Sequence, residues 1–178
     1  MRILYLPGNN AHNRIWIDQL AKDTNTSLEK DVLYYSHWDT GEDTINFDTE
    51  LEKLKTITKD DEYLVVGKSA GCALSLMAYK QNIVNIKRFI FLGFPYLWLE
   101  SLEINPKGLL SEIDKPILFI QKPLDPAISF NDLRGGIGDM NNLFAFLEYH
   151  RDEEADDNHG YDDTKYIGDI ITKETSSN

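Results

Sequence analysis

Short apolar runs alternate with amphipathic segments along almost the whole chain. Apolar runs of strand length occur at 2–6, 31–36, 63–66, 88–93, 116–121 and 143–149, and segments with helical spacing occur at 15–21, 51–57, 70–79 and 162–172. The last apolar run could also form a helix, because Ala145, Leu147 and Glu148 suit both structures. Strands that alternate with helices form a parallel sheet covered on both faces. We therefore predict an α/β fold, a three-layer α/β/α sandwich around a mostly parallel six-stranded sheet.

We predict little further regular structure in the segments between these runs. Residues 37–48 are polar and are expected to form a loop, and residues 94–112 are rich in aromatic side chains but interrupted by Pro95 and Pro106. This second segment leaves space for one short helix or loop. At 178 residues, we expect one α/β domain over 1–172, followed by a disordered tail over 173–178.

The composition narrows the class of protein and its partners. Hydrophobic residues make up 42% of the chain, as in soluble globular proteins. The formal net charge of −12 repels phosphate backbones and anionic membranes, so we expect no nucleic-acid or membrane partner, and it disfavours a strongly anionic substrate. No apolar run reaches the length of a membrane span and the chain begins directly with a strand, so we expect a cytoplasmic location. The single cysteine, Cys72, excludes an intrachain disulfide and a zinc cluster of thiolates, and is expected to be a buried side chain.

The segment from the third apolar run into the following helix carries the clearest chemical motif. Gly67-Lys68-Ser69-Ala70-Gly71 fits the pattern Gly-x-Ser-x-Gly, with a strand before it and a helix after it. In this motif the serine occupies a strained turn, and the flanking glycines let the backbone close around it. The N-terminus of the helix adds free N–H groups and a partial positive charge where an oxyanion would form. We expect Ser69 to be a nucleophile and Lys68 to be a solvated neighbour.

Two alternatives compete with this interpretation of the motif. Gly-Lys-Ser also ends the phosphate-binding loop Gly-x-x-x-x-Gly-Lys-Ser, but the first glycine of that pattern is replaced by Glu62. The other alternative is a structural glycine turn with an idle serine. Partner residues elsewhere in the chain decide between these possibilities.

Polar residues of catalytic type follow three of the apolar runs. Ser69 follows the third run, Asp125 the fifth and His159 the sixth, so the chain order is Ser, Asp, His. A serine hydroxyl is a weak nucleophile and needs an adjacent base, a role that histidine suits, while a carboxylate fixes the orientation of the imidazole. Functional groups in parallel sheets collect at the carboxyl ends of the strands. We therefore predict a Ser69-His159-Asp125 triad.

Other residues could fill the same roles. His12 precedes the nucleophile, His37 is expected to face substrate or solvent, and His150 ends the sixth run too early to reach Ser69. Asp132 and Asp139 are alternative acids, and we expect both on the loop after the fifth run. Only Asp125 comes directly off a strand.

These motifs resemble the α/β-hydrolase superfamily, in particular its compact lidless serine hydrolases, such as retinoblastoma-binding protein 9 and YdeN-like proteins. The resemblance covers nearly the whole chain: residues 67–71 match the nucleophile elbow, 125–128 the acid loop and 158–160 the histidine loop. It implies a minimal α/β-hydrolase fold with strand order 2-1-3-4-5-6. The turn after the first strand departs from the pattern, since many relatives have His-Gly where this chain has Pro7-Gly8.

The resemblance also suggests the remaining site residues. By position, the backbone N–H groups of Asn9 and Ala70 match the two oxyanion donors. Alternatively, the side chain of Asn10 could donate in place of the Asn9 N–H, or residues 8–10 could be a plain turn. Tyr96 and Trp98 would line a small acyl pocket, or else pack into the core. We expect Asn10, Tyr96 and Trp98 to contact substrate.

The sequence therefore favours a serine hydrolase that cleaves small or flexible esters, with thioesters and amides as further candidates. We expect no metal and no organic cofactor, and a small-molecule ester as the main partner. The alternative is a catalytically silent protein of the same fold that binds another protein, because a fold alone does not fix function.

Overall fold

A computed structural model describes residues 1–58, 60–151 and 154–176. Its sheet contains β1 (Arg2–Leu6), β2 (Lys30–Val32), β3 (Tyr63–Lys68), β4 (Ile86–Leu92), β5 (Ile117–Gln121) and β6 (Phe144–Glu148). The strand order is β2-β1-β3-β4-β5-β6 and every pairing between neighbours is parallel. The predicted fold class and strand order are both confirmed.

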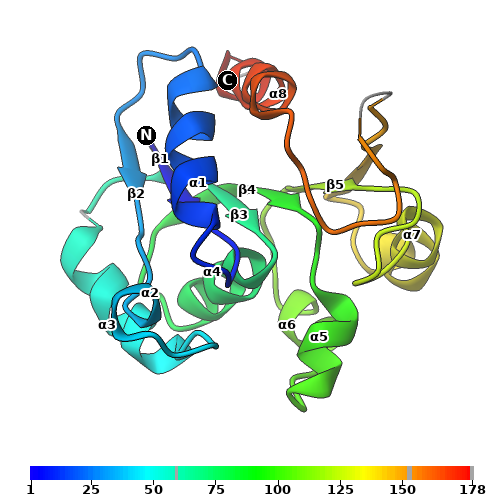
Figure 1. Cartoon of the computed structure of the whole chain (residues 1–178), viewed down its shortest axis with the longest axis horizontal. Coiled ribbons are helices and arrows are strands. Elements are labelled where there is room, and N and C mark those ends of the chain that lie inside the picture. Colours follow the sequence, from blue (N-terminus) through cyan, green and yellow to red (C-terminus); the bar gives the residue numbers. More distant parts are fainter. Residues whose placement is uncertain (59, 152–153, 177–178) are drawn as a thin grey trace.

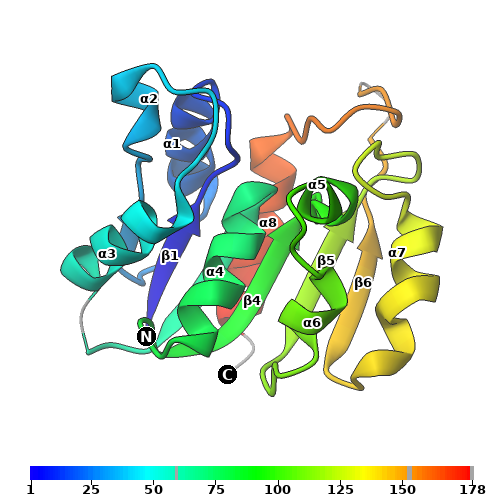
Figure 2. The same ribbon diagram turned by 90° about the horizontal axis from the view of Figure 1, so that it is seen from below.

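The helices lie on both faces of this sheet. They are α1 (Asn13–Asp23), α2 (His37–Thr40), α3 (Phe47–Ile57), α4 (Ala70–Lys80), α5 (Tyr96–Ser101), α6 (Pro106–Leu110), α7 (Phe130–Ile137) and α8 (Thr164–Ser176), with a 3₁₀ turn at Gly138–Met140. Figure 1 shows α1 and α8 on one face and α3, α4, α5 and α6 on the other. Figure 2 shows the strands running side by side, with α8 behind them. The result is the predicted three-layer sandwich.

Alternation of side chains along the central strands creates two separate cores. In β3, Tyr63 and Val65 join the core beneath α3, α4 and α7, whereas Leu64 and Val66 join the core beneath α1 and α8. Successive side chains of a strand point to opposite faces, so a strand covered on both faces must be apolar throughout. This explains why the central strands are nearly continuous apolar runs. Because all neighbouring strands are parallel, their carboxyl ends lie at one edge of the sandwich.

Several element boundaries differ from the sequence predictions. The second strand is shorter than predicted and ends at Val32, and the expected loop over 37–48 contains the short helix α2 and the first two residues of α3. Residues 94–112 contain two short helices, α5 and α6, so the expectation of one short helix or loop there is wrong. The helix α7 is absent from the predictions, because Gly135 and Gly136 weaken its helical signal. Asp132 therefore lies in α7 and Asp139 in the 3₁₀ turn, so a plain loop after β5 is wrong.

The chain end also differs from its prediction. Helix α8 continues through Ser176, so residues 173–176 are helical rather than part of a disordered tail. Residues 177 and 178 lie outside the described residues. Within the part of the chain that the structure describes, no helix combines the length and the apolar character needed to cross a membrane.

Candidate active site

Ser69 occupies a sharp turn between β3 and α4. Its backbone has φ +50° and ψ −116°, a conformation that non-glycine residues rarely adopt. A side chain at Gly71 would place its Cβ 2.0 Å from the carbonyl oxygen of Leu6, and one at Gly67 would meet the backbone of Cys72 at 2.9 Å. Both glycines are therefore required by close backbone approach, as the motif predicts.

Asp125 and His159 form a hydrogen-bonded pair at the same edge of the sheet. His159 Nδ1 lies 2.8 Å from Asp125 Oδ1 and 3.0 Å from Oδ2. The carboxylate is buried and also accepts hydrogen bonds from the Tyr161 hydroxyl at 2.7 Å and the Ala127 N–H at 2.8 Å. These donors hold the carboxylate in place and so fix the orientation of the imidazole.

The imidazole of His159 rests on Gly93, at the end of β4. Gly93 has φ +59°, and a Cβ built there would lie 2.8 Å from His159 Cε1 and 2.8 Å from Tyr161 Cε2. Both the positive φ and the close packing require glycine. Sequence patterns alone missed this residue, because its constraint comes from contacts with a loop far along the chain.

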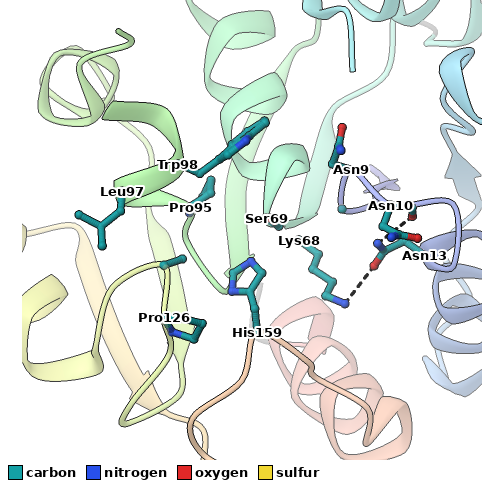
Figure 3. A pocket seen from close by; sticks show the side chains of 12 residues that line it. Asn9, Asn10, Asn13, Lys68, Ser69, Pro95, Leu97, Trp98, Pro126 and His159 are labelled. Atoms are coloured by element: carbon teal, nitrogen blue, oxygen red, sulfur yellow. Dashed lines mark hydrogen bonds between the residues drawn. The ribbon is translucent and has the colours of Figure 1, made fainter. Parts of the chain in front are cut away.

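Ser69 and His159 line one pocket of about 520 Å³. Figure 3 shows them near its centre, with Pro95, Leu97, Trp98 and Pro126 on one side and Asn9, Asn10, Asn13 and Lys68 on the other. Among the described residues, no hydrogen bond joins the Ser69 hydroxyl to His159. The structure thus brings all three predicted triad residues to one edge of the sheet and pairs two of them.

Solved structures with the same arrangement of elements are known. The esterase domain of a Rhodothermus marinus protein is 13% identical and gives a TM-score of 0.68, with 98% of this chain and 85% of that chain covered. An extracellular α/β-hydrolase from a Paenibacillus species is 14% identical, with a TM-score of 0.64 and coverage of 97% and 98%. A protein described as a YdeN-like hydrolase from Pectobacterium atrosepticum is 11% identical, with a TM-score of 0.66 and coverage of 97% and 89%. The chain has an α/β-hydrolase fold. No protein-family model matches the sequence, and neither does any curated protein sequence.

In this α/β-hydrolase fold, the turn after β1 is held from several sides. The side chain of Asn9 donates to the backbone carbonyl oxygen of Asp43 and accepts from the N–H of Ile45. The backbone carbonyl oxygen of Asn9 accepts from His37 Nε2 and from Trp38 Nε1. Among the hydrogen bonds of the described residues, none uses the N–H of Asn9 or of Ala70. Of these two residues, Asn9 lines the pocket that contains Ser69, and Ala70 directly follows Ser69 in the chain.

Lys68 differs from its prediction. Only 8% of its surface is exposed, so its interpretation as a solvated neighbour is wrong. Its Nζ donates to Asn13 Oδ1 at 2.9 Å and lies 4.4 Å from the centre of the Trp16 ring. Burial lowers the pKa of Lys68 to about 8, against the opposing effect of Asp162. Asn13 and Trp16 of helix α1 lie against this side chain, and neither contact is visible in the local sequence.

The predicted substrate contacts are divided between two cavities. Asn10 and Trp98 line the pocket that contains Ser69. Tyr96 instead lines a neighbouring cavity with Leu124 and Asp132, and its ring packs against Phe94. Trp98 also packs against Phe47, so it serves both the pocket and the core.

The rival histidines and acids lie elsewhere. His12 and His150 are exposed, and His150 pairs with Asp156 rather than with a serine. His37 is buried beneath the carbonyl of Asn9, so the expectation that it faces substrate or solvent is wrong. Ser129 caps α7: its hydroxyl accepts from the N–H of Asp132 and donates to Asp132 Oδ2. Asp139 is exposed.

A buried lysine anchors the loop that carries His159. Lys122 Nζ donates to the Ala155 carbonyl oxygen at 2.8 Å and to Asn158 Oδ1 at 3.0 Å, and it lies 3.1 Å from Glu154 Oε2. Burial opposes ionisation of Glu154, but hydrogen bonds from Tyr149 and Lys122 outweigh this effect and lower its pKa. This network holds the loop from its inner side. Within residues 1–58, 60–151 and 154–176, no group of His, Cys, Asp and Glu side chains has the arrangement of a metal site.

Proposed function

We propose that this protein is a serine hydrolase that cleaves carboxylic esters through an acyl-enzyme. The observation that carries the proposal is the Asp125–His159 hydrogen bond at the rim of a pocket that Ser69 lines from a strained turn. A strained serine and an imidazole oriented by a buried carboxylate are the parts that nucleophilic catalysis by serine requires. The α/β-hydrolase fold supports the proposal, since similar structures include an esterase domain.

In the proposed mechanism, Ser69 Oγ attacks the ester carbon while His159 Nε2 accepts its proton. The tetrahedral oxyanion is held by the N–H groups of Asn9 and Ala70, which have no partner within the described residues. The C–O bond to the alcohol then breaks, and His159 returns the proton to the leaving oxygen. Asp125 stabilises the cationic imidazole throughout.

In the second half of the reaction, water replaces Ser69 as the nucleophile and Ser69 becomes the leaving group. Water attacks the acyl-enzyme carbon, His159 takes its proton, and the bond to Ser69 Oγ breaks as the serine regains a proton. The steps use only side chains of this chain, backbone donors and water. Because Ser69 Oγ and His159 form no hydrogen bond in this structure, we expect the contact to form when substrate binds.

A fluorophosphonate probe tests the proposal directly. The wild-type protein should be labelled at Ser69, and labelling should be lost in Ser69→Ala and fall by at least about 100-fold in rate in His159→Ala, because general-base catalysis contributes about this much. Circular dichroism of each variant checks that it remains folded. A folded wild-type protein that is not labelled, and that hydrolyses no p-nitrophenyl ester of any chain length, would contradict the proposal and favour a binding protein.

A further inference from the structure

The pocket around Ser69 has two chemically different ends. One end consists of Pro95, Leu97, Trp98, Pro126 and Ala127, and the exposed side chain of Leu97 contributes to it. The other end consists of Asn9, Asn10, Asn13 and Lys68, as Figure 3 shows. A substrate whose reacting carbon lies at Ser69 therefore meets apolar groups on one side and amides with an ammonium on the other.

The charge of this pocket is opposite to that of the protein. The chain carries a formal net charge of −12, yet its only ionisable lining side chains among the described residues are Lys68 and His159. The carboxylate of Asp125 lies behind His159 and does not line the pocket. The lining thus offers hydrogen-bond donors and one cation, and no carboxylate that would repel an anion.

Lys68 keeps binding capacity that the protein does not use. Among the described residues, its Nζ has one hydrogen-bond acceptor, Asn13 Oδ1, a cation–π contact with the Trp16 ring, and no carboxylate within ion-pair distance. An ammonium has three N–H donors, and burying it without a carboxylate partner is unfavourable. A structural lysine at such a position would be expected to have more acceptors. Asn13 is in turn fixed, because its Nδ2 donates to the Asn10 carbonyl oxygen at 2.9 Å.

We propose that Lys68 binds a carboxylate of the substrate, so that the substrates are esters with an apolar group on one side of the scissile bond and a carboxylate on the other. This inference rests on the proposed hydrolase function and specifies its substrate class. A single carboxylate fits better than a dianionic phosphate, because the negative field of the whole protein acts against each added charge. The general expectation that anionic substrates are disfavoured is thereby restricted to highly charged ones.

The ionisation state of Lys68 is compatible with this role. The charged groups around it are Asp162, Asp125 and Glu154, which favour its ammonium form, and Lys122, which opposes it. Helix α1 contributes the uncharged Asn13 and Trp16. With a pKa of about 8, Lys68 is mostly protonated at neutral pH and loses its charge under mildly alkaline conditions.

The test compares anionic and neutral esters of nearly equal shape. One pair places the charge on the acyl side, monomethyl glutarate against dimethyl glutarate, and a second pair places it on the alcohol side, 4-acetoxybenzoate against methyl 4-acetoxybenzoate. The measured quantity is the ratio of kcat/KM for the anionic ester to that for the neutral ester, followed by acid release in a pH-stat. It is determined for wild type, Lys68→Met and Lys107→Met, an exposed lysine in α6 whose replacement changes the net charge equally.

In at least one of the two ester pairs, the ratio of kcat/KM for the anionic ester to that for the neutral ester should fall about tenfold or more in Lys68→Met, since a charge-assisted hydrogen bond has this strength. The ratio should stay unchanged in Lys107→Met. In wild type, the same ratio should fall as the pH rises through about 8, and this fall should be absent in Lys68→Met. A ratio that stays within about twofold of wild type in both pairs would overturn the inference, as would an equal loss on charged and neutral esters.

A binding measurement separates this inference from the hydrolase proposal. Titration calorimetry of wild type and Lys68→Met with the monoanions pentanoate and benzoate requires no turnover. Binding that weakens about tenfold in Lys68→Met supports the carboxylate site even if no ester is cleaved and no probe labels Ser69. Equal binding to both proteins, or no binding to either, counts against the carboxylate site even if Ser69 proves to be a nucleophile.

Discussion

Two buried lysines at the same edge of the sheet differ in the hydrogen-bond acceptors and carboxylates around their ammonium groups. Lys122 is 1% exposed, has two oxygen acceptors and a carboxylate 3.1 Å away, and lies outside the pocket. Lys68 is 8% exposed, has one amide acceptor, and lines the pocket beside Ser69. The first ammonium ties together parts of the protein. The second has fewer hydrogen-bond acceptors than N–H donors, and its residue lines the pocket that contains Ser69.

This difference separates structure from binding in physical terms. A buried charge whose hydrogen-bonding capacity is filled by the protein holds its surroundings in one arrangement, and removing it leaves other groups unpaired. A buried charge with unused donors raises the free energy of the folded protein, and a ligand with the opposite charge can recover that loss. The two lysines should therefore respond in opposite directions to the same substitution.

The largest effect is expected for Lys122→Met. Glu154, Ala155 and Asn158 would lose their shared donor in a buried position, which should lower the free energy of unfolding by about 3–5 kcal/mol. Urea unfolding followed by circular dichroism measures this quantity. Replacing the carboxylate as well, in Lys122→Met with Glu154→Gln, should recover part of the loss. A stability equal to wild type for the single variant would show that the ammonium does not anchor the histidine loop.

Lys68→Met should have the opposite sign, because it removes a charge that the folded state does not fully satisfy. The pKa of Lys68 is lowered from 10.5 to about 8. Between these two values the unfolded chain binds more protons than the folded one, so wild type gains stability as the pH rises. Lys68→Met should thus be more stable than wild type at neutral pH, on the order of 3 kcal/mol, and this advantage should disappear by about pH 10.5. If the difference in free energy of unfolding between Lys68→Met and wild type did not change with pH, the lowering of the Lys68 pKa by burial would be contradicted.

A smaller effect on stability, with the main loss in activity, is expected for Gly93→Ala on the histidine side of the pocket. The new Cβ would lie 2.8 Å from His159 Cε1 and would require a positive φ, so the imidazole must move. We expect kcat/KM for a neutral ester to fall about 100-fold while the protein stays folded. Gly135→Ala in α7 is a matched control, since a Cβ there meets nothing within 4 Å. Equal activity of the two variants would show that His159 does not depend on Gly93.

The fold could be predicted from the sequence because its signals are local. Continuous apolar runs marked the buried parallel strands, and the motif at Ser69 combined a strand, a strained turn and a helix within residues 63–80. The pairing of Asp125 with His159 followed from their positions after strands, because parallel strands end at a common edge. Helix α7 escaped prediction, since paired glycines weaken helical propensity.

Parts of the site could not be predicted because they depend on contacts between distant segments. Lys68 follows an apolar strand in the sequence, and only the packing of Asn13 and Trp16 against it shows that it is buried. His37 is polar and lies in a polar segment, yet a carbonyl oxygen of the β1 turn binds it inside the protein. Tyr96 and Trp98 are both aromatic residues of α5, and the sequence does not distinguish them. They line different cavities because they lie on different faces of this helix.

The contact between Gly71 and Leu6 has a consequence for how such a protein can change over evolution. Because no side chain fits between them, the end of β1 and the start of α4 are in direct backbone contact, and this contact sets the spacing between Asn9 and Ala70. Changes in ligand specificity are therefore expected to come from substitutions at other residues that line the pocket, such as Leu97 or Lys68. The backbone around Ser69 would stay the same while the bound molecules differ.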